Sequence, residues 1–134
     1  MAERFKEILE NARTIAVVGL SDQSDRTSYR VSRYMQDRGY KIIPVNPTIS
    51  ESLGEKAYPS LLDVPDKVDI VNVFRRPKDV PVVADEAIAI KARVLWMQEG
   101  IVNEPAAEKA KAAGLKVVMD RCIMVEYARM TAGL

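Results

Sequence analysis

Short apolar runs separated by longer polar segments dominate the chain. Continuous runs of this kind are typical of parallel strands that are covered by helices on both faces. We therefore predict five parallel strands, with a short extra edge piece near Lys56–Tyr58. The five strands are predicted at Thr14–Val18, Tyr40–Val45, Val68–Phe74, Val94–Met97 and Lys116–Met119.

Helical patterns fill the intervals between these runs. Asp79 and Asn103 are placed to cap two of the helices through side-chain oxygens, and Gly39 and Gly114 are placed to end two. The helices are predicted at Glu3–Asn11, Ser28–Arg38, Asp79 to about Ile90, Asn103 to Gly114 and Ile123–Met130.

This alternation predicts one α/β domain over residues 1–134, a length that fits a single domain. We expect a three-layer, Rossmann-like, doubly wound fold with a mainly parallel sheet of five to six strands. Ligands of such sheets bind beyond the carboxyl ends of the strands, where the strand order reverses. The loops at that edge are therefore the ones to inspect.

Charge and composition narrow the classes of partner. The chain has 20 basic and 19 acidic residues, so no global field attracts nucleic acid or an anionic membrane, and we expect neither partner. No apolar run approaches 18 residues and the first residues lack a signal-peptide core, so we expect a cytoplasmic protein.

The chain contains no histidine and one cysteine, Cys122. Ser-His and Cys-His nucleophile pairs, imidazole acid–base catalysis and His-ligated metals are thereby excluded within this chain. Asp120 and Cys122 are the only suggestive reactive pair, and a buried structural thiol is the favoured interpretation. We predict no catalytic and no metal-binding residues.

Two predicted loops carry anion-binding chemistry. The loop Gly19–Ser28 leaves the first strand through a glycine, contains Arg26 and hydroxyl side chains, and enters a helix N-terminus, which suits a pyrophosphate. Ser28 alone also fits a helix cap. Phe74, Arg75 and Arg76 follow the third strand, where they can pair with phosphate and stack on adenine, or form surface salt bridges.

A third loop argues against NAD. Dinucleotide-binding domains place Asp or Glu at the end of the second strand to bind the ribose hydroxyls. Asn46 and Pro47 stand there instead, which leaves room for a phosphorylated ribose, as in coenzyme A or NADP, and also fits a plain turn. The first loop has a single glycine and lacks the Gly-x-Gly-x-x-Gly pattern.

Several strings in the chain resemble the stand-alone CoA-binding domain family, which is similar to the first domain of the succinyl-CoA synthetase α-subunit. The resemblance covers about residues 4–130. It rests on the strings Ile15–Ser21, Arg26–Ser28, Ile43–Pro47, Val68–Val71, Phe74–Arg76 and Val118–Cys122.

The resemblance implies coenzyme A as the cofactor and assigns a role to each loop. It implies that the first loop holds the pyrophosphate through Gly19, Ser21, Arg26 and Ser28, and we predict Thr27 as a further cofactor-binding residue of this loop. It further implies that Asn46 and Pro47 lie near the ribose phosphate and that Phe74, Arg75 and Arg76 flank the adenosine.

The chain departs from the family at two positions. Tyr127 stands where the family usually has His, and Lys91 where it usually has Gly, so we expect Lys91 to adopt a positive φ. The synthetase reaction needs a phosphohistidine on a second domain, so we expect a non-catalytic module that binds or senses coenzyme A or acyl-CoA, with a partner protein supplying function. A small NADP-linked reductase and a cofactor-free interaction scaffold, engineered from this family, are the alternatives.

Overall fold

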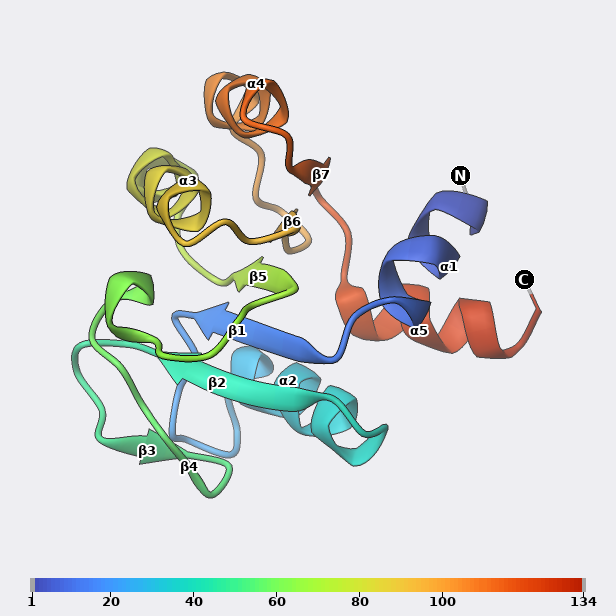
Figure 1. Cartoon of the computed structure of the whole chain (residues 1–134). Helices are drawn as coiled ribbons and strands as arrows, with labels where there is room; N and C mark the ends of the chain where they lie inside the picture. Colours follow the sequence, from blue (N-terminus) through green and yellow to red (C-terminus); the bar gives the residue numbers. More distant parts are fainter. Residues whose placement is uncertain (1, 134) are drawn as a thin grey trace.

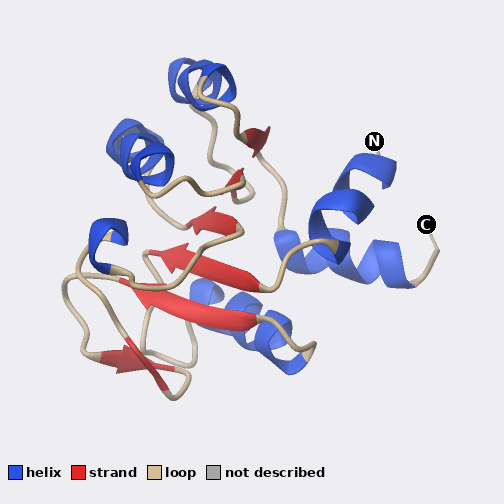
Figure 2. Ribbon diagram, viewed as in Figure 1, coloured by secondary structure: helices blue, strands red, loops and turns tan. Residues whose placement is uncertain are grey.

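A five-stranded parallel sheet forms the centre of this computed structural model, which describes residues 2–133 (Figures 1 and 2). The strand order is β2-β1-β5-β6-β7, so the order reverses between β1 and β5. The strands are β1 (Thr14–Val18), β2 (Lys41–Val45), β5 (Ile70–Val73), β6 (Val94–Met97) and β7 (Lys116–Val118). The predicted Rossmann-like, doubly wound α/β fold is confirmed.

Helices cover both faces of the sheet, so all four residues of β5 and of β6 are buried (Figure 1). Figure 1 shows α3 and α4 on one face and α1, α2 and α5 on the other. The helices are α1 (Ala2–Glu10), α2 (Thr27–Asp37), α3 (Val80–Ala89), α4 (Glu104–Ala112) and α5 (Ile123–Thr131). None of the described helices is both long and apolar enough to cross a membrane.

Each face of the sheet has its own apolar core, because successive residues of a strand point to opposite faces. Ala16 and Val71 pack toward α3 and α4. Val17 and Trp96 belong to the other core, where Trp96 is fully buried and its indole N–H donates to the Arg121 carbonyl at 2.8 Å. The two cores pack the helices against both faces of the sheet. This packing fixes the positions of the strand ends from which the loops extend.

The predicted edge piece near Lys56–Tyr58 is only partly correct. The strands β3 (Glu51–Ser52) and β4 (Glu55–Lys56) pair antiparallel with each other, in a hairpin outside the main sheet. Tyr58 makes a single parallel bridge to Val45 at the edge of β2. The main sheet therefore has five strands.

Two of the predicted helix signals have different outcomes. Asn103 caps α4, since its side-chain oxygen accepts from the Ala106 N–H at 3.0 Å. Asp79 stands at the N-cap of α3 but makes no capping bond, because a 3-10 turn (Pro77–Asp79) precedes the helix there. Lys91 has φ 58°, which confirms the expected left-handed conformation after α3.

Candidate functional site

A cavity of about 490 Å³ lies at the carboxyl ends of the strands, at the reversal of strand order between β1 and β5. The loop after β1, the N-terminus of α2, the loop after β2 and the loop after β5 form its walls. We call it the strand-end crevice. The residues that line it are Gly19, Ser21, Asp22, Arg26, Thr27, Ser28, Asn46, Thr48, Ile49, Phe74 and Arg75.

Gly19 allows the loops after β1 and β5 to approach each other. Its φ is 92°, and a Cβ atom built on it would lie 2.4 Å from the Phe74 carbonyl oxygen. The Gly19 N–H donates to the Val45 carbonyl at 2.8 Å, and the Phe74 N–H donates to the Val18 carbonyl at the same distance. Only glycine combines this conformation with this approach, so the floor of the crevice depends on it.

The N-terminus of α2 opens onto the crevice without a side-chain cap. Arg26 occupies the N-cap position in extended geometry, and its side chain makes no hydrogen bond to the first turn. Thr27 and Ser28, the first two helical residues, line the cavity. The first backbone N–H groups of a helix and its positive dipole end favour an anion at this place.

Hydrogen bonds hold the loop after β1 in a fixed shape. The Ser28 hydroxyl oxygen accepts from the Ser21 N–H at 3.0 Å, so Ser28 braces the loop and does not cap α2. Ser52, in the β3–β4 hairpin, donates its hydroxyl hydrogen to the Ser21 carbonyl at 2.8 Å. The hairpin therefore supports the crevice from outside the main sheet.

Asn46 ties the loop after β2 to the loop after β1. It is 8% exposed, and its side-chain Nδ2 donates to the Leu20 carbonyl at 3.0 Å. Its Oδ1 accepts from both the N–H and the hydroxyl of Thr48, at 3.0 and 2.7 Å. These bonds form an Asx turn, in agreement with the plain turn that was one interpretation of the Asn46-Pro47 pair. The turn brings Asn46 and Thr48 to the cavity wall, whereas Pro47 is exposed outside the cavity.

The two arginines after β5 occupy different environments. Arg75 is half-buried and lines the crevice with Phe74, and its Cδ lies 3.4 Å from the Cβ position built on Gly19. Arg76 does not line the cavity, and its Nε contacts the Asp79 carboxylate at 3.4 Å on the surface. The surface salt bridge that was an alternative for both arginines thus applies to Arg76.

The crevice gathers eight of the ten predicted site residues, all except Pro47 and Arg76. Asp22, Thr48 and Ile49 also line the wall and were not among the predicted site residues. Thr48 had a signal, since Asn and Asp side chains often bond the backbone two residues further on. The wall contains two guanidinium side chains, those of Arg26 and Arg75, and one carboxylate, that of Asp22, which leaves a cationic surplus.

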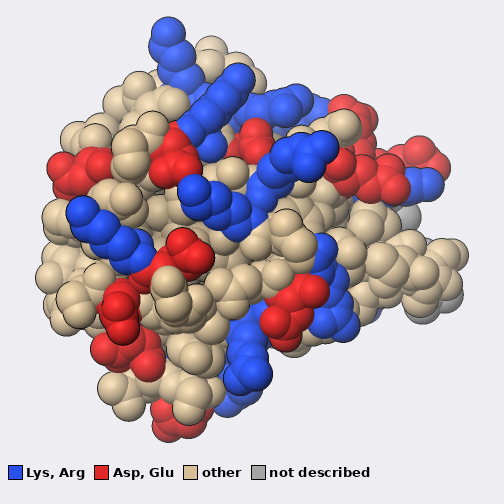
Figure 3. All heavy atoms as spheres, turned by 60° about the horizontal axis from the view of Figure 1, so that its bottom comes forward, with Lys and Arg blue, Asp and Glu red and all other residues tan. Residues whose placement is uncertain are grey.

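On the face of the molecule shown in Figure 3, basic side chains are interleaved with acidic ones. This matches the formal net charge of +1. Any strong affinity for an anion must therefore come from a local arrangement such as Arg26 and Arg75 at the N-terminus of α2.

The second suggestive group of residues lies apart from the crevice. Cys122 occupies the N-cap position of α5 and is half-buried, packed against the apolar core that contains Trp96, whereas a buried structural thiol was expected. Asp120 is exposed, has φ 58° and accepts from the Gly100 N–H at 2.7 Å. Within residues 2–133, no group of three or more Cys, Asp or Glu residues is arranged to hold a metal ion.

Comparison with known proteins gives a consistent family. The profile described as "CoA binding domain" matches residues 13–128. YneT, an uncharacterized protein of Bacillus subtilis (strain 168), is 55% identical over 124 residues, which cover 92% of each chain. A hypothetical protein from Pyrococcus horikoshii OT3 superposes with a TM-score of 0.95 at 40% identity, over 98% of this chain and 92% of that one.

Larger enzymes contain a region similar to this chain. The α-subunit of the ADP-forming acetate–CoA ligase I of Pyrococcus furiosus is 34% identical over 137 aligned positions. The alignment covers 90% of this chain and 30% of the ligase subunit, so the chain spans about a third of that relative's length.

Proposed function

The chain belongs to the CoA-binding domain family, and we propose that it binds coenzyme A or an acyl-CoA in the strand-end crevice as a non-catalytic binding or sensing module. One observation carries the proposal: a single cavity is lined by Gly19, by Arg26 and Arg75, and by the N-terminus of α2, which has no side-chain cap. These groups supply backbone donors and cationic charge for a pyrophosphate.

The parts of the ligand follow from the walls. We place the pyrophosphate at Thr27 and Ser28, where the N–H groups of α2 begin, with Arg26 and Arg75 as its counter-charges. Phe74 offers an aromatic face to the adenine.

We place the phosphorylated ribose beside Asn46. The end of β2 carries no carboxylate that would repel the ribose phosphate. We propose that Pro47 and Arg76 contact the ligand at the mouth of the crevice. Arg76 must first release its contact with Asp79.

Non-catalytic binding is also supported by the available side chains. The chain has no histidine, and the crevice wall contributes no cysteine or lysine. We propose that a partner protein uses the bound acyl-CoA. Because the chain has almost no net charge to attract nucleic acid or an anionic membrane, we propose neither as a partner. We expect a cytoplasmic location.

Titration calorimetry with coenzyme A, dephospho-coenzyme A, NADP and NAD tests the proposal. We expect coenzyme A to bind most tightly, and dephospho-coenzyme A more weakly because it lacks the ribose phosphate. Tighter binding of NADP would favour the alternative of a small NADP-linked reductase, because NADP also carries a pyrophosphate and a ribose phosphate. Absence of heat with all four ligands would contradict both cofactor hypotheses and leave the scaffold.

A further inference from the structure

A second cavity, of about 380 Å³, lies at the opposite edge of the sheet and shares no residue with the strand-end crevice. It is formed where the end of α1 meets the amino ends of β5, β6 and β7 and the turns that follow α3 and α4. We call it the amino-edge cavity. Its volume is within the range of small-molecule sites in proteins, roughly 300–1,000 Å³.

Aliphatic and charged side chains share the walls of the amino-edge cavity, with the aliphatic ones buried at its base and most of the charged ones exposed at its rim. Ile8 from α1, Ile70 from β5, Val94 from β6 and Leu115 before β7 line it, and each is less than 9% exposed. The backbone beside them offers few free polar groups, because the turns after α3 and α4 bond to their own helix ends. A ligand must therefore place an apolar part inside and find its polar contacts at the charged rim.

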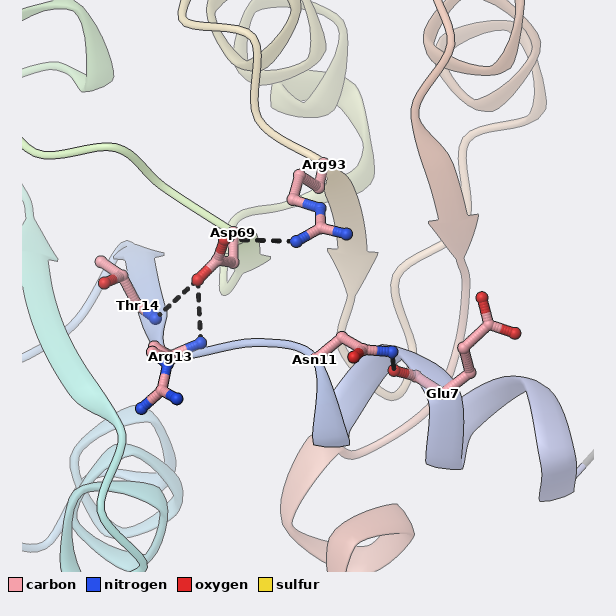
Figure 4. Close-up of polar contacts among 6 residues, drawn as sticks. All are labelled: Glu7, Asn11, Arg13, Thr14, Asp69 and Arg93. Atoms are coloured by element: carbon pink, nitrogen blue, oxygen red, sulfur yellow. Dashed lines mark hydrogen bonds and ion pairs between the residues drawn. The ribbon is translucent and has the colours of Figure 1, made fainter.

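Charged side chains at the rim are mostly compensated, and cations are in excess. The carboxylate of Asp69 accepts from the backbone N–H groups of Arg13 and Thr14 at 2.8 and 3.1 Å, and it also faces Arg93 at 4.0 Å (Figure 4). The side chain of Arg13 points away from this group (Figure 4).

Glu7 is compensated in the same way, because Lys116 contacts its carboxylate at 2.5 Å. This ion pair also lowers the pKa of Glu7, through a hydrogen bond and the charge of Lys116. Both acids at the rim are thus paired with cations.

Lys91 is the remaining cation of the rim, and it has no ion pair with any residue in the range 2–133. Its backbone adopts φ 58°, a conformation that disfavours lysine relative to glycine by about 1 kcal/mol. The conformation closes the C-terminal end of α3, where the N–H groups of Lys91 and Ala92 donate to the Ile88 and Ala87 carbonyls, each at 3.0 Å. The position thus places an ammonium group without an ion pair beside the aliphatic base of the cavity, at a cost in stability.

We propose that the amino-edge cavity binds a short-chain aliphatic carboxylate. The alkyl chain lies among Ile8, Ile70, Val94 and Leu115, and the carboxylate lies at Lys91, with Arg93 as the second cation within reach of the rim. This site is independent of the crevice, so its test does not depend on coenzyme A binding.

Titration of the amide NMR spectrum with sodium hexanoate tests the proposal, with hexanol and hexylammonium as matched probes. We expect saturable shifts at Ile70, Val94 and Leu115, and weaker binding of both matched probes. Lys91→Gly should raise the hexanoate Kd about two- to fivefold, the scale of one exposed ion pair. Lys91→Arg and the distant control Lys56→Gln should keep the wild-type Kd.

Lys91→Gly also relieves the backbone strain, so weaker binding by this variant cannot arise from unfolding. Three results would overturn the proposal. They are the absence of saturable shifts at the cavity, hexanol binding as tightly as hexanoate, and an unchanged Kd in Lys91→Gly.

Discussion

Replacement of Gly19 by alanine should destabilise the protein more than replacement of any glycine in open space. The positive φ alone costs about 1 kcal/mol in a residue with a Cβ. The new Cβ would also lie 2.4 Å from the Phe74 carbonyl oxygen, which is backbone and cannot rotate away. Forcing such an overlap apart costs typically about 1–3 kcal/mol, so the expected total loss is about 2–4 kcal/mol.

Gly39→Ala provides the matched control. Gly39 has φ 100°, close to the 92° of Gly19, but no heavy atom lies within 4 Å of its Cβ position. This variant should lose only the conformational part, about 1 kcal/mol. The difference between the two variants therefore isolates the close approach of the loops after β1 and β5.

Urea denaturation followed by circular dichroism measures both losses, because the free energy of unfolding falls linearly with urea concentration. We expect the Gly19→Ala midpoint to lie well below that of Gly39→Ala at unchanged slope. If the two variants agree within about 0.5 kcal/mol, the usual scatter of surface substitutions, the close approach at Gly19 carries no energy and the reasoning is wrong.

Three further predictions concern Arg26, Lys91 and Tyr40. Arg26→Ala should weaken coenzyme A binding by about 1–3 kcal/mol, the scale of a charge-assisted contact, while Arg33→Ala, elsewhere on α2, leaves it unchanged in calorimetry. Lys91→Gly should raise the free energy of unfolding by about 1 kcal/mol in urea. Burial raises the pKa of Tyr40 to about 12, so stability should fall by up to about 2–3 kcal/mol as pH rises from 10 to 12.

The sign of the Tyr40 effect follows from proton binding. Above pH 10 the unfolded chain ionises this phenol while the folded chain keeps it protonated, as a donor to the Leu9 carbonyl at 2.5 Å. Tyr40→Phe should therefore flatten the alkaline limb of a pH series of urea melts, and an unchanged limb would contradict the assignment. A destabilised Lys91→Gly, or equal Kd values for Arg26→Ala and Arg33→Ala, would refute the other two predictions.

The strands and the location of the crevice could be predicted because both depend on patterns local in the sequence. Buried parallel strands need continuous apolar runs, and the end of such a run marks the edge where loops meet. The Gly19 loop and the phenylalanine–arginine string therefore predicted one site, and Gly19, Phe74 and Arg75 line the same cavity. Their contact with a ligand stays a prediction.

Features that depend on pairing between distant segments were not predictable. The contact of Gly19 with the Phe74 carbonyl arises only when β1 pairs with β5. Arg75 and Arg76 look equivalent as neighbours, yet the path of the backbone directs only one into the crevice. The two-residue strands of the hairpin around Gly54 are too short to carry a hydrophobic period, so the sequence indicated only an edge piece near Lys56–Tyr58 and not the pairing of β3 with β4.

A crystal structure of the protein grown with coenzyme A is the most direct test of the central proposal. We expect electron density in the strand-end crevice, with the pyrophosphate at the N-terminus of α2 between Gly19 and Arg75 and the adenine beside Phe74. An empty crevice at saturating coenzyme A, or the cofactor bound elsewhere on the molecule, would contradict it.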